Sequence, residues 1–570
     1  MKRRTGKKEC FLGMSIIGSI KLEEMKNKWI IAAFMLGAVT TVEAQNLYDA
    51  ERVMSNELNG TARFVGMGGA MGALGGDIST IGTNPAGIGI FRSNDLSVSF
   101  GLNHTGAEAT FAGTKINQDK TRASFDQIGF VYSNKIGNTT SLRYVNFAFN
   151  YHKSRNFNRL FEMGGNLDGF SQTWQLANNL NNAGITEKEI NSIFESEGNP
   201  YTQNAYSKYS VLGLMGIRTG LVGWESNKAL GYDSPAGWNG ANNNYYSREK
   251  GGIQAYDFNV AFNLDDRFYL GATVGVYDLN YSRFSTYTEN LIGFKGSDGG
   301  IYSIPQEGDK PVDNGGYTLD NYYELSGTGV DLKVGAIFRP FEESPFRFGI
   351  AVHTPTWYDL SEHYDAVLSS KIHAFDNREK KPFNSQRLSD YLSQDYLTYD
   401  YRIQTPWKFN VNMGSTVGTS FAFGAEYEYA DYGTCKLRDV DGDELGDQVS
   451  VKKYLKGVHT MKVGAEYRFV QAFSVRAGYN YATAAFDKNA YNALAPYSTN
   501  TTFLNSKDRH TATCGLGYRG NRWYADLAYK YDVYKTEFFP FDDKLKEATL
   551  PATKIDFSRH QLLLTIGARF

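Results

Sequence analysis

Cysteine and proline are scarce in this chain. Three cysteines and 13 prolines occur among 570 residues. Cys10 falls in the leader described below, and the remaining Cys435 and Cys514 are too few for the disulfide framework of a small secreted protein. Neither has a histidine or a second cysteine at metal-site spacing. We therefore expect no disulfide framework, no bound metal and no cofactor.

Long apolar runs and an excess of charge of one sign are also missing. No segment reaches the roughly 18 uninterrupted apolar residues that a membrane-spanning helix requires. The 59 basic and 61 acidic side chains give a formal net charge of −2, so the chain lacks the basic character of a nucleic-acid binder. The 39 Tyr and 37 Phe argue against a wholly disordered chain. The sequence thus excludes a helical membrane protein and predicts no nucleic-acid partner.

The first 44 residues predict an export signal rather than a folded domain. From Met25 the chain has a short basic region, an apolar stretch over 29–39 and small residues before Ala44, which is the order of a secretory signal peptide. Cleavage is expected after Ala44. Residues 1–24 precede an otherwise complete signal, so we expect the true start at Met25. A genuine long basic leader is the alternative.

Beyond Asn94, apolar and polar residues alternate along the chain. Phe258, Val260 and Phe262 alternate with polar or small neighbours, for example. Successive side chains of a strand point to opposite faces, so each such segment has one apolar and one polar face. Several segments keep the alternation for about ten residues, which is the length of a strand in an outer-membrane barrel and longer than strands of a soluble sandwich. The pattern favours an all-β transmembrane barrel over a sandwich.

Short links alternate with long links between the candidate strands, as in bacterial barrels with an even strand number. The candidates are fourteen, near 94–102, 125–133, 143–153, 253–264, 267–281, 320–338, 346–354, 402–413, 420–430, 459–469, 472–483, 510–518, 521–534 and 557–570. We predict a 14-stranded antiparallel barrel over 94–570. Its long external links include 103–124, 282–319, 355–401 and, as the largest, 154–252. A further candidate near 360–376 is expected to extend the wall beyond the membrane.

The chain ends in an amphipathic strand whose last residue is Phe570. Leu562, Leu564 and Ile566 share its apolar face. A terminal strand that ends in Phe resembles the signal that outer-membrane barrel assembly machinery recognises. We therefore expect that machinery as a partner, with an ordinary amphipathic strand as the alternative.

The segment 45–93 is rich in glycine, with nine glycines between Gly66 and Gly89. It superficially resembles a phosphate-binding loop, but no βαβ unit surrounds it and no Gly-Lys-Ser/Thr sequence follows. Small residues at this density allow close packing against other backbone. We predict a compact plug inside the barrel lumen. The residues expected to shape it are Gly66, Gly68, Gly69, Asp77, Asn84, Pro85, Ala86 and Gly87.

The order of motifs in this segment resembles the FadL/TodX family of outer-membrane transporters. Asp77-Ile-Ser-Thr80 is followed by Asn84-Pro-Ala-Gly87, after a Gly/Ala-rich run and before the first strand. The resemblance implies a 14-stranded barrel with an N-terminal hatch and long-chain fatty acids or aromatic hydrocarbons as ligands. It also implies capture among external loops, transfer to a site above the hatch and release through a gap in the wall. The chain from Gln45 onward would reach into the lumen.

The external segment 154–252 differs from the better-known members of the family, which leaves the ligand open. Thr186 and Glu189 form a capping box at a helix start. Apolar residues of two expected helices and a following run are Trp174, Leu180, Ile190, Phe194, Leu212, Met215, Ile217 and Trp224. They are expected either to line a groove for an acyl chain or to bury one another as a cap.

Charged residues also occur on the polar strand faces, where they would point into the lumen. They are Lys462, Glu466, Arg468 and Arg476. The cations would either meet a carboxylate head group or pair with acids and tether the plug.

The loop from Asp439 to Asp447 resembles a calcium-binding loop. It departs from the EF-hand because Glu444 stands where Gly is needed and Ser450 where Glu is needed. A solvated acidic loop is the favoured interpretation.

No catalytic set is recognisable, and the eight histidines are scattered. We predict a monomeric outer-membrane channel, not an enzyme, for passive uptake of hydrophobic small molecules, with outer-membrane lipid around it. One alternative is a haem-binding receptor that uses His152, His353 or His363. A general porin and a barrel adhesin without transport are the others.

Overall fold

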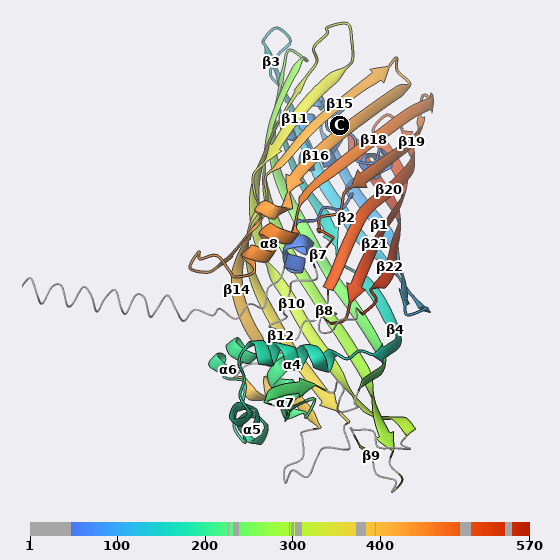
Figure 1. Cartoon of the computed structure of the whole chain (residues 1–570). Coiled ribbons are helices and arrows are strands. Elements are labelled where there is room, and N and C mark those ends of the chain that lie inside the picture. Colours follow the sequence, from blue (N-terminus) through green and yellow to red (C-terminus); the bar gives the residue numbers. More distant parts are fainter. Residues whose placement is uncertain are drawn as a thin grey trace, which may run out of the picture. The chain divides into compact units, whose positions relative to one another are not determined.

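Figure 1 shows the protein as a computed structural model. The structure describes residues 47–225, 227–231, 239–295, 297, 301–302, 310–371, 384–393, 395–488, 490, 503–541 and 550–570. The leader and signal peptide expected over 1–44 lie outside the described residues and stay a prediction.

Fourteen wall strands form one closed antiparallel sheet in the described chain. In order around the wall they are β1 (Asp95–Phe111), β2 (Thr114–Lys135), β3 (Leu142–Asn156), β7 (Asn239–Leu264), β8 (Phe268–Lys295), β10 (Lys310–Phe338), β11 (Arg347–His353), β15 (Lys408–Val417), β16 (Phe421–Asp431), β18 (Gly457–Val470), β19 (Phe473–Ala482), β20 (Phe503–Arg519), β21 (Trp523–Phe539) and β22 (Thr553–Arg569). Each pairs with the next, and β22 pairs with β1 from Lys554 to Arg569. The predicted 14-stranded antiparallel barrel is confirmed.

The wall is polar inside and apolar outside. On β1, Leu96 and Leu102 are 45% and 49% exposed, whereas Ser97 and Asn103 between them are 1% and 4% exposed. A soluble sandwich would bury the leucines and expose the serine. The outer surface is therefore built to meet hydrocarbon rather than water.

Several segments expected as long links are strands instead. β1 and β2 run through 103–124 to a tight turn at Ala112 and Gly113, and β8 and β10 occupy most of 282–319. Past the apolar band the outer face meets water, while the inward face carries apolar side chains of the core cluster, such as Phe111, Tyr287 and Leu291, together with polar ones. The polar-inside, apolar-outside alternation of the wall is therefore lost there. This is why the sequence placed the ends of these strands too early.

The wall also continues beyond the apolar band through separate short strands. They are β4 (Arg159–Gly169), β12 (Trp357–Ser370), β13 (Ser385–Arg387), β14 (Leu397–Gln404) and β17 (Lys436–Asp439). β12 pairs with β10 and β14, as the further candidate near 360–376 predicted. The remaining short elements are β9 (Ile301–Tyr302), η3 (Ser389–Tyr391), η4 (Tyr432–Thr434) and α8 (Gln448–Tyr454).

Four helices cover the barrel end opposite the short turns, at the bottom of Figure 1. They are α4 (Gln172–Asn182), α5 (Glu187–Glu195), α6 (Gln203–Tyr209) and α7 (Val211–Arg218), and the small hairpin β5 (Val222–Glu225) and β6 (Lys228–Gly231) follows them. We call this unit the cap. The predicted capping box is present, because Thr186 and Glu189 bond reciprocally. The helices of the described chain are all too short or too polar to cross a membrane.

The N-terminal segment from Leu47 to Phe91 lies inside the barrel (blue in Figure 1). Its elements are α2 (Leu47–Met54), α3 (Ala62–Gly66), η1 (Ile78–Gly82) and η2 (Pro85–Ile90). Thr61, Asp77 and Asn84 begin the last three as N-caps, each accepting a backbone N–H bond with its side chain.

Candidate functional site

The N-terminal segment touches the wall backbone to backbone at a set of wall glycines. A Cβ on Gly478 would lie 2.2 Å from the Gly68 nitrogen, and a Cβ on Gly464 would lie 2.1 Å from the Met67 oxygen. Gly68 itself has a φ of +64°, a backbone conformation that favours glycine. The glycines on both sides of the contact therefore allow a close approach that any other residue would block.

Asn84 bridges three wall strands from the centre of the Asn-Pro-Ala-Gly motif. Its Nδ2 lies 3.3 Å from the Ala336 oxygen, 3.4 Å from the Ile350 oxygen and 3.3 Å from Asn412 Oδ1. Its Oδ1 accepts the backbone N–H of Ala86 at 3.1 Å. The buried amide thus orders its own turn and fixes that turn to the wall.

Glycine again makes the approach possible beside this motif. A Cβ on Gly335 would lie 2.1 Å from Asn84 Oδ1, and one on Gly271 would lie 2.4 Å from the Pro85 carbonyl carbon. Gly87 accepts the Gly76 N–H through its carbonyl at 3.2 Å. The motif therefore packs on the wall as a close-fitting turn.

Other predicted residues of this segment stabilise its interior. Asp77 accepts the Ser79 N–H at 3.0 Å and the Thr61 hydroxyl at 2.8 Å. Gly66 accepts the Thr513 hydroxyl at 3.2 Å. Gly69 has a φ of +81°. Asp77, Gly66 and Gly69 shape a compact segment, and none of the three lines the cavity described below.

Three of the four predicted lumen charges form ion pairs. Arg63 of α3 lies 3.0 Å from Glu466, which lies 2.5 Å from Arg476. Arg476 continues to Asp526 at 2.6 Å, and Lys462 lies 2.6 Å from Glu426. The network ties the N-terminal segment to the wall.

Arg468 does not join this network. It is exposed near the short-turn end of β18, and its backbone N–H donates to the Ser420 oxygen at 2.6 Å. Arg468 stands opposite the buried Ser474, in the same register that places Glu466 opposite Arg476. It therefore lies on the lumen-facing side of β18, at the strand end that is open to solvent.

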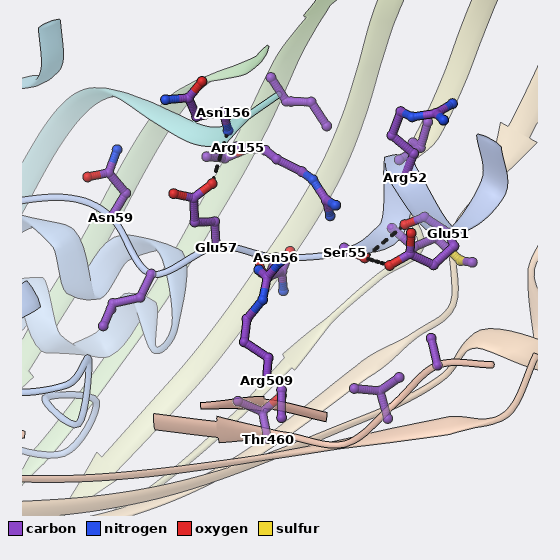
Figure 2. Close-up of a pocket in the computed structure, with 18 of the residues that line it drawn as sticks. Glu51, Arg52, Ser55, Asn56, Glu57, Asn59, Arg155, Asn156, Thr460 and Arg509 are labelled. Atoms are coloured by element: carbon purple, nitrogen blue, oxygen red, sulfur yellow. Dashed lines mark hydrogen bonds between the residues drawn. The ribbon is translucent and has the colours of Figure 1, made fainter. Parts of the chain in front are cut away.

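A cavity of about 290 Å³ lies in the lumen beside α2 and the linker 55–59. Its lining also includes residues of α3, η1 and the wall strands β3, β20 and β22 (Figure 2). Apolar side chains such as Met54, Phe64 and Phe557 share the lining with many charged side chains. The cavity therefore suits a molecule with both an apolar part and a charged part.

The cations of the cavity differ in how far they are neutralised. Arg559 binds Glu57, and Lys530 lies 3.3 Å from the same carboxylate. Arg509 lies 3.7 Å from Asp532. Arg155 makes no ion pair within the described chain, and its buried Nη1 has no hydrogen-bond partner there. A buried guanidinium nitrogen without an acceptor is costly, so Arg155 is ready to receive an anionic group.

The wall has a seam between β2 and β3 beside this cavity. Their ladder ends at Gln127 and His152, although both strands continue further. β2 carries an extra residue, Asp126, against β1, and β3 carries an extra residue, Ser154, against β7. Such bulges bend a strand and interrupt its pairing. Strands β2 and β3 therefore separate where the two bulges lie.

Side chains close the seam from both sides. Inside, Asn59 Nδ2 donates to Asp126 Oδ1 and to the Lys153 oxygen, each at 3.0 Å. Outside, the rings of Phe125 and Tyr151 stack with centroids 5.5 Å apart. The seam is thus held by side-chain contacts where the backbone ladder is missing.

The residues expected to form an acyl groove pack against one another in the cap. Leu180, Ile190 and Met215 are fully buried in one apolar cluster, and Trp224 is half-buried against it. Trp174, Phe194, Leu212 and Ile217 are buried as well, and none of the eight lines the lumen cavity. The packing matches the alternative of a self-burying cap and leaves no described groove between these residues.

The candidate haem ligands do not come together. His152 and His353 both line the cavity, but His353 Nε2 donates to the Thr83 oxygen at 3.0 Å. His363 is half-buried on β12, and its Nδ1 lies 3.1 Å from the Thr398 hydroxyl. The three histidines therefore do not form one site.

The acidic loop satisfies itself from its own backbone. Asp439 Oδ1 accepts the N–H groups of Asp441, Gly442 and Asp443 at 2.8–3.0 Å. Among the residues that the structure describes, no three potential metal ligands are grouped.

Phe570 closes the barrel at its terminus. Its N–H donates to the Asn94 oxygen at 3.2 Å, and the Asn94 N–H donates back at 3.0 Å. Its side chain is 64% exposed. An accessible terminal ring is compatible with recognition during assembly, which stays a prediction.

Arg155 and Asn59 are the site residues that the sequence did not reveal. Arg155 follows the bulge at Ser154, which reverses the facing expected from alternation. Asn59 lies in a linker without any periodic pattern. A polar residue in such a linker gives no signal until the contacts are seen.

Comparison with protein-family models and with curated proteins gave no match. Among solved structures, the chain is similar to a Pseudomonas aeruginosa FadL homologue, with 12% identity and a TM-score of 0.44 over 90% of this chain and 99% of that chain. It is similar to the Pseudomonas putida toluene transporter TodX, with 11% identity and a TM-score of 0.43 over 91% and 100% of the two chains. The Ralstonia pickettii toluene transporter TbuX gives 13% identity and a TM-score of 0.41 over 90% and 98%. These structures belong to the family that the hatch motif resembles.

Proposed function

We propose that this protein is an outer-membrane channel, not an enzyme, for passive uptake of hydrophobic small molecules. The observation that carries the proposal is a cavity inside the barrel. The N-terminal segment closes it towards the short turns, and the seam borders it at the side. The N-terminal segment acts as the hatch. Export by the signal peptide, recognition of Phe570 by the assembly machinery and a monomeric state belong to the same proposal.

The path runs from the external end, through the cavity, to the seam. The hatch meets the wall at backbone distance, which opposes straight passage through the lumen. At the end of the β2–β3 ladder, Asn59 inside and the Phe125–Tyr151 stack outside close the wall. Rearrangement of three side chains costs less than displacing the hatch, so lateral release is the favoured exit.

The cavity favours a long-chain fatty acid over an aromatic hydrocarbon. Arg155 Nη1 is buried without an acceptor, and a carboxylate would supply one. A toluene-like molecule would leave that nitrogen unsatisfied. The apolar side chains Met54, Phe64 and Phe557 of the same cavity would receive methylenes, each worth about 0.8 kcal/mol when buried.

Ligand titration in mild detergent tests the carboxylate. Binding of palmitate and of hexadecane is measured for the wild type, Arg155→Gln and Arg402→Gln. The last variant is the control, because Arg402 is exposed and does not line the cavity. We expect Arg155→Gln to weaken palmitate binding about tenfold, because a charge-assisted hydrogen bond is lost, and to leave hexadecane binding unchanged. Equal palmitate affinity in both variants contradicts the head-group assignment. A wild type that binds neither ligand, or that carries haem, contradicts hydrophobic uptake.

Cross-linking of the seam tests lateral release. Phe125→Cys and Tyr151→Cys are joined by a short bis-maleimide, in a background where Cys435 and Cys514 are alanine. We expect uptake by whole cells to stop while palmitate binding in detergent persists. Each single-cysteine variant treated with the same reagent is the control. Undiminished uptake by the cross-linked protein would place the exit elsewhere.

A further inference from the structure

Four basic side chains gather beside the seam, where β2 leaves β3. Lys120 and Arg122 come from β2, and Arg248 and Lys250 come from β7, with β4 between them. Arg248 and Lys250 are exposed, and the two β2 residues are half-buried. We call these four residues the basic cluster.

Contacts across β4 show that the two strands share this surface. Gln118 of β2 donates to Glu162 Oε2 at 2.7 Å, and Asn244 of β7 donates to the other oxygen at 2.9 Å. Arg122 donates to Asn158 Oδ1 at 2.6 Å, at the start of β4. The cations of β2 are an even number of residues from Gln118, so they lie on the face of β2 that meets β4. Those of β7 are an even number of residues from Asn244, on its outward face.

The basic cluster is not neutralised within the described chain. None of its four members has an ion pair there, and the carboxylate beside them, Glu162, is bonded to two amides. Partial burial lowers the pKa of Lys120, and the charges of Arg122, Arg248 and Lys250 lower it further. Mutual repulsion of this kind is relieved by an external anion.

A belt of tyrosine and histidine on the outer surface gives the depth of the basic cluster. Three tyrosine hydroxyls lie 2.6–2.7 Å from a histidine Nδ1 on the neighbouring strand. The pairs are Tyr427–His459, Tyr479–His510 and Tyr529–His560. All three have the same diagonal register, and a second tyrosine stands opposite each histidine. Amphipathic rings in such a belt sit at the boundary between hydrocarbon and head groups.

The basic cluster begins at the level of this belt. His104 stands opposite His560, with ring centroids 6.0 Å apart, and its Nδ1 lies 2.9 Å from the Thr121 hydroxyl. Thr121 is flanked by Lys120 and Arg122. These two cations point to the opposite face of β2 from Thr121, towards β4. Towards the short turns, β7 presents Tyr256 and Phe258 on the same outward face as its own two cations, and Phe258 is 54% exposed. Cations therefore stand at head-group depth with an apolar surface directly beneath them.

We infer that the basic cluster binds the phosphate groups of a lipid in the surrounding leaflet, whose acyl chains lie on the apolar surface below. Charge complementarity selects a phosphate, and the adjacent apolar surface selects a lipid over a free anion. Arginine is suited to bidentate phosphate contact, and clusters of four or more cations at a membrane surface bind anionic head groups. The inference rests on the proposed membrane location but not on the transported ligand.

The test compares lipid retention by full-length protein in nanodiscs of phosphatidylcholine that contain about one tenth diphosphoryl lipid A. Native mass spectrometry after transfer to detergent counts the lipids retained by the wild type and by Lys120→Gln/Arg122→Gln/Arg248→Gln/Lys250→Gln. A matched control removes four exposed lysines elsewhere, through Lys452→Gln/Lys453→Gln/Lys535→Gln/Lys554→Gln. We expect the wild type and the control to retain lipid A about tenfold more than phosphatidylcholine, and the cluster variant to lose that preference.

Two outcomes would overturn the inference. One is equal lipid A retention by the cluster variant and the control. The other is displacement of lipid A by inorganic phosphate at millimolar concentration, which indicates a site for free anions. Palmitate binding is measured in the same samples and is expected to be the same in all three proteins. Its absence from the wild type would contradict the proposed transport while the lipid result still decides this inference.

Discussion

The two ends of the lumen are filled in opposite ways. The N-terminal segment meets the wall through glycine, backbone and ion pairs, as at Gly478 and along the Arg63–Glu466 contact. The cap fills the external end with its own apolar core, which includes Leu180, Ile190 and Met215. A polar lumen offers few apolar partners, so a segment inside it must bind by close approach and hydrogen bonds. The cap packs in one apolar cluster with side chains of the extended wall strands, such as Tyr287 of β8 and Leu319 of β10.

The polar contacts of the cap both hold its helices together and attach it to the wall. Arg218 donates to the Gln386 side chain at 2.7 Å and to the oxygens of Ile193 and Ser196 at 3.1 and 2.8 Å. Glu289 of β8 accepts the Gln172 N–H at 3.1 Å and the Ser171 hydroxyl at the start of α4. The comparison therefore predicts that wall substitutions disturb the N-terminal segment, whereas loss of a single polar anchor loosens the cap alone.

The largest effect is expected from Gly478→Ala. The new Cβ would meet the Gly68 nitrogen at 2.2 Å, so the N-terminal segment must move away from the wall. We expect a loss of about 1–3 kcal/mol in stability and a rise in single-channel conductance. Gly82→Ala is the matched control, because nothing lies within 4 Å of its Cβ. Unchanged conductance and melting of Gly478→Ala would show that close approach does not hold the segment.

Arg218→Met should loosen the cap without affecting the barrel. Three acceptors would lose a buried donor, which costs about 1–3 kcal/mol. We expect faster tryptic cleavage in the cap, where Lys208 is exposed, at an unchanged melting temperature of the barrel. Arg402→Met removes an exposed ion pair and is expected to change neither quantity. A barrel that melts earlier in Arg218→Met would contradict the independence of the cap.

Arg63→Gln should have a smaller effect than Gly478→Ala on the same segment. Glu466 keeps its contact with Arg476, so the loss is expected to be about 1 kcal/mol. The measurement is conductance noise together with barrel melting. Lys452→Gln, which breaks the exposed pair with Glu444, is the control. An effect larger than that of Gly478→Ala would make ion pairing, not close approach, the main attachment.

The smallest effect is a pH dependence of cap attachment through Glu289. Burial raises the pKa of Glu289 above its usual value of 4.5, although hydrogen bonds from Ser171, Gln172, Tyr287 and Tyr317 act against the rise. The attached state therefore binds a proton more readily than the detached state. Its attachment is strongest at low pH and weakens as pH rises from about 4.5 through the raised pKa.

Cap proteolysis between pH 5 and 8 measures this dependence. We expect slower cleavage at the acidic end for the wild type and a flatter profile for Glu289→Gln, which cannot ionise. Glu187→Gln, on the exposed side of α5, is the control and should keep the wild-type slope. A Glu289→Gln profile parallel to that of the wild type would exclude this carboxyl as the source.

The sequence by itself determined the barrel, its strand number and the position of the glycine-rich segment before the first strand. Alternation between polar and apolar residues is a local consequence of strand geometry against lipid, so it can be read from the chain. It was lost along 103–124 and 282–319, where the outer face meets water and the inward face carries apolar side chains such as Phe111 and Leu291, packed in the apolar cluster of the external end.

Only the tertiary structure decided the seam, the cavity and its unpaired Arg155, the burial of the cap residues and the basic cluster. The bulges at Asp126 and Ser154 change the direction in which the following side chains point, and no residue type at these positions predicts a bulge. Asn59 can bond to Asp126 and Lys153 because β2 and β3 separate beside it. Lys120 and Lys250 are far apart in the chain and share a surface because β4 lies between their strands. Such sites depend on contacts between distant segments, which local patterns do not encode.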